Sequence, residues 1–432
     1  MKKLKRFSSV FLAAAMLAAA FTGCSDTASS TESDEAAAIE ATSLEETEAT
    51  TAEPQTDEEF YAAMVARSLN RIGNTHRLKE KLEQARSGEE TTIAYIGGSI
   101  TEGVGATAET CYAYLSYADF AETYGTGDNV QYVNAGLSGT PSILGNLRLD
   151  RDVLSYEPDV AFIEFAVNDG QDTITQQSYE SMVKTILEQD NEPAIVIICN
   201  RLKNGYTAQE YMINIAEFYD LPVVSMADAL TPELDEGRLT WEEYSDDESH
   251  PNTYGHQVVA ECIAYMWAQE DAAEDSGSFT VRQGGIYGIP YENAEMITPE
   301  ILENGSVDGI EIISTGSFNA VSSGTSGFPT SWKYSGEGQE PLKLKVSANS
   351  IFMIIRRNNS DKMDSFEVYL DGDRLTTISA NQSDGWGEAY AEQIIKYQGV
   401  HDDMEIEIYP AEGSEDKELT ILGFAFTQNT TF

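Results

Sequence analysis

Cysteine and histidine are scarce in this sequence, with four residues of each among 432. No histidine stands at zinc-ligand spacing from another His or Cys, so we expect no catalytic metal and no cofactor. The three cysteines that follow the first 24 residues are odd in number and widely spaced, which does not predict a disulfide framework. Two of them, Cys199 and Cys262, lie in apolar patterns, and we expect both to be buried.

Basic residues are also few, 26 Lys and Arg against 73 Asp and Glu, and the formal net charge is −47. Without the four positive charges of residues 1–24 and the nine acids of residues 25–56, residues 57–432 carry −42. Such a surface repels nucleic acid and anionic lipid head groups, so we expect no nucleic-acid partner. The acidity can equally serve only to keep an exported protein soluble.

Apolar runs long enough to span a bilayer, roughly 20 residues, are missing. The apolar run at residues 10–21 follows four basic residues and ends just before Cys24, which is typical of a signal peptide over residues 1–24. Residues 21–24 resemble the bacterial lipoprotein cleavage box, and this implies that Cys24 carries a lipid anchor; ordinary cleavage nearby is the alternative. We expect a protein on the extracellular face of the bacterial cell membrane, held to the membrane only through this lipid.

The rest of the chain is long enough for two domains. Residues 25–58 are acidic and poor in large apolar residues, which predicts a disordered tether. A polar stretch at residues 269–278 separates two different hydrophobicity patterns. We therefore expect a first domain over residues 59–270 and a second over residues 278–432.

The first domain is predicted to be α/β. A helical pattern covers residues 60–85, and apolar runs of strand length then alternate with helical stretches. Strands that are apolar on both faces predict a three-layer, doubly wound parallel sheet of the flavodoxin-like kind, with reactive groups beyond the carboxyl ends of the strands. We expect strands at 92–96, 130–134, 160–167, 194–199 and 222–225, and helices at 111–123, 142–153, 177–188, 208–218 and 254–267.

The second domain is predicted to be an antiparallel β-sandwich. Residues 342–346 and 404–408 alternate apolar with polar side chains, and Asp371-Gly372 has the composition of a hairpin turn. Trp332 and Trp386 are candidates for stacking on sugar rings, although such aromatics more often fill a core.

Residues with catalytic potential follow three of the predicted strands and precede the last helix. Ser99 follows two glycines at the first strand end, where a plain turn or a phosphate cradle is the alternative reading, and no P-loop lysine follows. Gly136 and Asn168 stand at the second and third strand ends and are candidate donors to an oxyanion. Asp247 lies three residues before His250, close enough to orient the imidazole as a general base.

In this order the four blocks resemble the SGNH (GDSL-like) hydrolase family over about residues 66–268. The resemblance implies that Ser99 is the nucleophile, that Asp247 and His250 complete a triad, and that Ser99, Gly136 and Asn168 form the oxyanion hole. The sequence departs from the common pattern by having Gly98 before the serine and Ala166 before the Asn block. Its Gly-Gly-Ser-Ile-Thr block is similar to that of carbohydrate esterases, which often carry an added β-sandwich.

The resulting hypothesis is a surface esterase that removes O-acetyl groups from an acetylated polysaccharide, its sandwich assisting substrate placement. The alternatives are a lipid or thioester hydrolase on the same fold and a non-catalytic glycan-binding lipoprotein. Glu164, alone inside an apolar strand, is either a buried partner of the site or an edge residue.

Overall fold

The computed structural model describes residues 56–428, so the predicted signal peptide, Cys24 and the tether up to residue 55 lie outside the described residues. Within residues 56–428 no helix is long and apolar enough to cross a membrane. The limits proposed for the domains stay predictions.

The first domain is built on a six-stranded sheet, and its predicted class is confirmed. Five strands are parallel, and they are arranged in the order 2-1-3-4-5 when numbered along the chain, as in flavodoxin-like folds. β1 adds an antiparallel edge beside β6. The strands are β1 (Leu69–Arg71), β2 (Thr91–Gly97), β3 (Val130–Gly136), β4 (Val160–Glu164), β5 (Ala194–Cys199) and β6 (Val223–Ser225).

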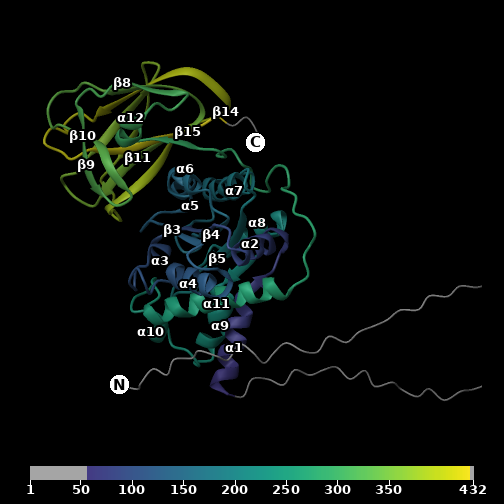
Figure 1. The fold of residues 1–432 in the computed structure, drawn as a ribbon. Helices are drawn as coiled ribbons and strands as arrows, with labels where there is room; N and C mark the ends of the chain where they lie inside the picture. The colour runs from purple at the N-terminus through teal and green to yellow at the C-terminus, as the bar shows by residue number, and fades with distance from the viewer. Residues whose placement is uncertain (1–55, 429–432) are drawn as a thin grey trace, which may run out of the picture. The chain divides into compact units, whose positions relative to one another are not determined.

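Helices cover both faces of this sheet, because successive side chains of each strand point to opposite sides. Ile93 and Tyr95 of β2 pack into one apolar core, and Ala94 and Ile96 pack into the other. Figure 1 shows β3, β4 and β5 between α7 and α4. The first core is closed by α1 (Asp57–Ser68), α2 (His76–Ser87), α4 (Tyr112–Tyr124), α9 (Met226–Asp235) and α11 (Thr253–Ala272), and the second by α6 (Leu149–Asp152), α7 (Thr173–Leu187) and α8 (Gln209–Tyr219).

The helix predicted over residues 60–85 is in fact two helices, α1 and α2, with β1 between them. Gly73 has a φ of 66°, and a side chain there would meet the backbone of Leu221. Pairing of β1 with the edge of β6 therefore overrides the local helical pattern. The third predicted strand is also shorter than expected, because the amides of Asn168 and Asp169 both turn back to the carbonyl of Phe165 at 3.0 Å.

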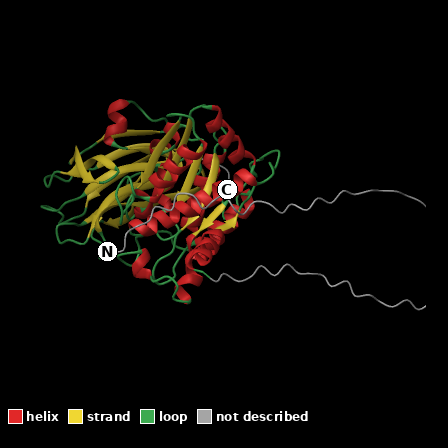
Figure 2. Ribbon diagram, turned by 60° about the horizontal axis from the view of Figure 1, so that its bottom comes forward, coloured by secondary structure: helices red, strands yellow, loops and turns green. Residues whose placement is uncertain are grey.

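The second domain is antiparallel, as predicted, and its nine described strands form one hydrogen-bonded network (Figure 2). Asp371 and Gly372, at φ of 51° and 86°, form the predicted hairpin turn. The strands are β7 (Glu295–Ile297), β8 (Ile310–Ser314), β9 (Phe318–Thr325), β10 (Phe328–Tyr334), β11 (Leu342–Asn358), β12 (Ser365–Leu370), β13 (Asp373–Ser379), β14 (Trp386–Pro410) and β15 (Thr420–Thr427), with α12 (Pro299–Asn304) after β7.

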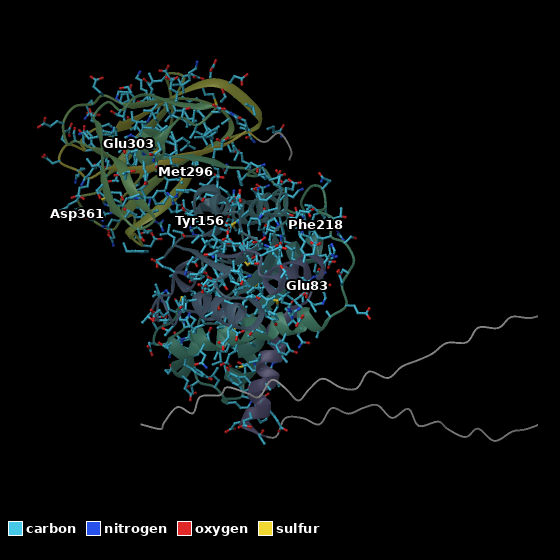
Figure 3. All side chains as sticks on the ribbon, in the orientation of Figure 1. Glu83, Tyr156, Phe218, Met296, Glu303 and Asp361 are labelled. Atoms are coloured by element: carbon cyan, nitrogen blue, oxygen red, sulfur yellow. The ribbon has the colours of Figure 1, made fainter. Side chains whose placement is uncertain are left out.

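Strand β15 and residues 348–355 of β11 are buried on both faces. Met353 and Phe424 point into the core of the β domain, whereas Phe352 and Leu422 enter a separate apolar cluster. That cluster also contains Leu144 of α5 (Ser142–Leu147) and the chain around Met296, whose side chain is labelled in Figure 3. The β domain and the α/β domain therefore share an apolar, packed contact.

Candidate active site

The turn that carries Ser99 begins where β2 ends at Gly97. A side chain on Gly97 would collide with Thr101, and one on Gly98 would collide with the amide of Asn168. Both positions therefore need glycine, and the second contact places Asn168 beside the residue that precedes Ser99. Ser99 itself starts the short helix α3 (Ser99–Glu102).

Ser99, His250 and Asp247 form a continuous hydrogen-bonded chain. Ser99 Oγ lies 2.9 Å from His250 Nε2, and His250 Nδ1 lies 2.7 Å from Asp247 Oδ2. When Nδ1–H donates a hydrogen bond to Asp247, Nε2 is left free to accept the proton of the Ser99 hydroxyl. The structure thus brings together the three side chains that the sequence predicts as a triad.

The carboxylate of Asp247 stays ionised because of its hydrogen bonds. Its Oδ1 accepts the amides of Ser249 at 2.6 Å and of His250 at 2.7 Å. Partial burial favours the neutral acid, but the hydrogen bonds from the His250 ring and from the two amides outweigh it and lower the pKa of Asp247. An ionised Asp247 orients the imidazole and stabilises its protonated form.

The loop that carries His250 is anchored by Ser245, which the sequence reading did not single out. Ser245 Oγ lies within hydrogen-bonding distance of the carbonyls of Asp247, at 2.9 Å, and His250, at 2.6 Å. Trp241 Nε1 donates to the carbonyl of Asp247 at 2.6 Å. Asn252 caps α11 by accepting the amide of Gly255 at 3.0 Å. These contacts hold the loop that carries the imidazole in place.

Gly136 does not offer the free amide that the prediction requires. Its N–H donates to Asn134 Oδ1 at 2.8 Å, an Asx-type contact that the Asn-x-Gly spacing could have suggested. Gly139, three residues later, has a φ of 71°, and its amide has no hydrogen-bond partner among residues 56–428. Gly139 is therefore the better candidate for a backbone donor at this strand end.

Known proteins resemble this chain in sequence pattern and in fold. Residues 95–258 match the model of the GDSL-like Lipase/Acylhydrolase family. The matched residues span most of the α/β domain. A crystal structure of a two-domain esterase active on acetylated mannans is similar to the whole molecule, with a TM-score of 0.75, 26% identity, and coverage of 85% of this chain and 99% of that chain. A two-domain esterase active on acetylated mannans and co-crystallized with mannopentaose is also similar, with a TM-score of 0.72 and 26% identity. The likeness covers 84% of this chain and 98% of that chain. No curated protein matches the chain.

Glu164 is a buried partner of the GDSL-like site. It is fully buried at the end of β4, and it accepts a hydrogen bond from Thr101 Oγ1 at 3.2 Å. Burial raises the pKa of Glu164 to about 7. Asp169 is a second such carboxyl that the sequence reading missed; burial raises its pKa to about 7, and Tyr211 donates to it at 2.6 Å.

The two tryptophans that are candidates for stacking on sugar rings differ in their exposure to solvent. Trp332 is 2% exposed and packs on Phe424 in the core of the β domain. Trp386 is 60% exposed, and a side chain on Gly139 would lie 2.5 Å from its Cζ2 atom. The β domain therefore places an exposed indole on the strand-end loop of the GDSL-like domain that carries the free amide.

The remaining titratable candidates are structural. Cys111, Cys199 and Cys262 are free and buried. The His256 ring is buried and lies 3.1 Å from both the Tyr112 amide, which donates to Nδ1, and the Val104 carbonyl, which faces Nε2. Burial lowers the pKa of His256, consistent with the neutral form that these two contacts require.

Replacing Glu164 with Gln is expected to change how stability depends on pH. The folded protein binds the carboxyl proton of Glu164 more tightly than the unfolded chain does. The stabilisation that this proton gives to the fold is therefore full below about pH 4.5 and is lost as pH rises through about 7. Between pH 5.5 and 8 the wild-type free energy of unfolding should fall by more than that of Glu164→Gln in urea titrations. The exposed control Glu90→Gln should follow the wild type. Equal falls in Glu164→Gln and wild type would contradict the prediction.

Proposed function

We propose that this protein is a serine esterase that removes O-acetyl groups from a polysaccharide. The observation that carries the proposal is the hydrogen-bonded chain from Ser99 through His250 to Asp247. The family of residues 95–258 and the likeness of both domains to an esterase active on acetylated mannans support it.

In the proposed mechanism Ser99 Oγ attacks the acetyl carbonyl while His250 Nε2 takes its proton. The negative oxygen of the tetrahedral intermediate accepts hydrogen bonds from the amides of Ser99 and Gly139 and from the side-chain amide of Asn168, each worth about 3 kcal/mol. His250 then returns the proton to the departing sugar oxygen. A water molecule, activated by the same imidazole, releases acetate from the acyl-enzyme.

A polymeric carbohydrate suits the surroundings of this triad. The Asp247 side chain is 54% exposed, so the site is open at the surface instead of deeply enclosed. Trp386 offers a flat apolar face beside it, and neutral sugars are not repelled by the acidic surface. A lipid or thioester hydrolase and a non-catalytic glycan-binding protein remain the rival functions.

Replacement of Ser99 with Ala is expected to lower kcat on 4-nitrophenyl acetate by on the order of 10⁶, because the triad acts as a unit. The exposed control Ser87→Ala should keep wild-type kcat. Faster wild-type turnover of 4-nitrophenyl palmitate than of the acetate would favour lipid hydrolysis. If the wild type turned the acetate over no faster than Ser99→Ala, a non-catalytic glycan-binding protein would be the remaining function.

Replacement of Trp386 with Ala is expected to raise KM on acetylated mannan by about tenfold, the loss of one good stacking contact. The kcat/KM on 4-nitrophenyl acetate should stay within about twofold, because this substrate is too small to need the indole. Leu375→Ala, which removes another exposed apolar side chain of the β domain, serves as the control. An unchanged KM on the polymer would remove Trp386 from substrate binding.

We also propose attachment to the outer face of the cell membrane by a lipid on Cys24, which rests on the residues around that position. In a bacterial host, a radiolabelled fatty acid is expected to enter the wild-type chain and a Cys111→Ala control but not Cys24→Ala. Label retained in Cys24→Ala would reject the anchor.

A further inference from the structure

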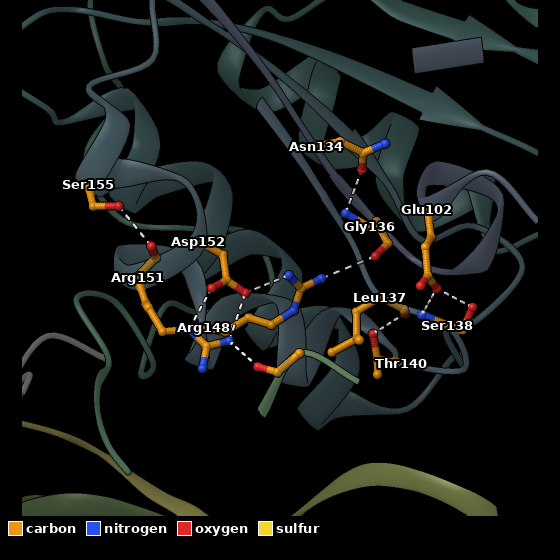
Figure 4. Close-up of polar contacts among 12 residues, drawn as sticks. Glu102, Asn134, Gly136, Leu137, Ser138, Thr140, Arg148, Arg151, Asp152 and Ser155 are labelled. Atoms are coloured by element: carbon orange, nitrogen blue, oxygen red, sulfur yellow. Dashed lines mark hydrogen bonds and ion pairs between the residues drawn. The ribbon is translucent and has the colours of Figure 1, made fainter. Parts of the chain in front are cut away.

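The carbonyl of Gly97, two residues before Ser99, accepts two hydrogen bonds. The Leu137 amide donates to it at 3.0 Å, and Arg148 Nη2 donates to it at 3.2 Å. The surroundings of Arg148 are drawn in Figure 4. The orientation of this carbonyl sets the path of the chain into Ser99, so both donors act on the nucleophile turn.

Arg148 is an unusual residue for this position because it is fully buried. Its side chain is 1% exposed, and its charge is balanced by Asp152, whose Oδ2 lies 3.0 Å from Nη1. Burial lowers the pKa of Arg148, while burial of Asp152 is outweighed by Arg151 and Arg148, which lower the pKa of Asp152. Burying a guanidinium is costly unless it is paired, so the position of Arg148 depends on Asp152.

Asp152 is in turn held by Arg151, which reaches into the β domain. Arg151 Nη2 lies 3.0 Å from Asp152 Oδ2 and donates to the carbonyl of Gly327 at 2.9 Å. Its guanidinium lies 5.0 Å from the ring centroid of Phe328. Gly327 belongs to the turn between β9 and β10, so one charged network links this turn to the Gly97 carbonyl.

The same turn also contacts the other donor. A side chain on Gly327 would lie 2.9 Å from the methyl groups of Leu137. Both groups that donate to Gly97 are therefore braced by the β9–β10 turn, one through apolar contact and one through Arg151 and Asp152.

We propose that Arg148 is a positioning residue for Ser99, and that the β9–β10 turn sets its position through Arg151 and Asp152. The proposal rests on Ser99 being the nucleophile of the proposed esterase. If Arg148 acts in this way, the β domain is necessary for fast turnover even of an ester that is too small to contact the β domain. This role is separate from any sugar contact made by Trp386.

The first test is Arg148→Lys, since a lysine cannot bind the Gly97 carbonyl and Asp152 with two nitrogens. A misplacement of about 1 Å can cost about 100-fold in rate. We expect kcat on 4-nitrophenyl acetate, and the rate at which a fluorophosphonate modifies Ser99, to fall about tenfold or more with KM nearly unchanged. Arg77→Lys is the matched control, because Arg77 is also buried and donates to two backbone carbonyls, at 3.0 and 2.9 Å.

The second test is Arg151→Met, whose side chain is 25% exposed and tolerates replacement better. Its kcat should fall about threefold or more, and the double variant should be no slower than Arg148→Lys, since the two residues act in series. Arg86→Met is the control, because Arg86 likewise forms an ion pair, with Asp271, and stacks on an aromatic ring, that of Tyr124.

Wild-type kcat in Arg151→Met, or in folded Arg148→Lys, overturns the proposal, as do equal losses in the controls. If Arg148→Lys does not fold, Arg151→Met decides alone. Failure of the esterase itself would instead appear as activity retained by Ser99→Ala.

Discussion

The hydrogen bond between Ser99 and His250 is the contact on which the site depends, and it joins two loops far apart in the chain. It can form only because the parallel strands all end at the same edge of the sheet. That edge also brings Asn168 against Gly98, in a contact so close that no side chain fits at the glycine. The catalytic arrangement is thus a consequence of strand direction, and the two glycines are what the close approach requires.

Beneath this edge lie three buried ionisable side chains. Glu164 and Asp169 are fully buried carboxyls, and Arg148 is a fully buried guanidinium. Each would favour a less charged or more exposed arrangement, so their retention under the nucleophile turn costs stability. Glu164 accepts a hydrogen bond from Thr101, and Arg148 donates one to the Gly97 carbonyl, so these two buried groups support the backbone of the nucleophile turn.

The β domain is tied to this arrangement in two physically different ways. An apolar cluster around Phe352 and Leu144 supplies non-directional adhesion between the domains. Arg151 and Gly327 add a directional hydrogen bond that specifies where the β9–β10 turn rests. Together they explain why an exposed residue such as Trp386 can occupy a defined place beside Gly139.

The parallel α/β class, the antiparallel second domain and the convergence of Ser99, Asn168, Asp247 and His250 could all be predicted from the sequence, because apolar periodicity and strand-end motifs are local signals. Three features could be seen only in the folded chain: the break in the helical pattern at residues 69–75, the hydrogen bond that occupies the amide of Gly136, and the support that Glu164 and Arg148 give to the nucleophile turn. These outcomes depend on contacts between segments distant in the chain, whose energies no local pattern contains.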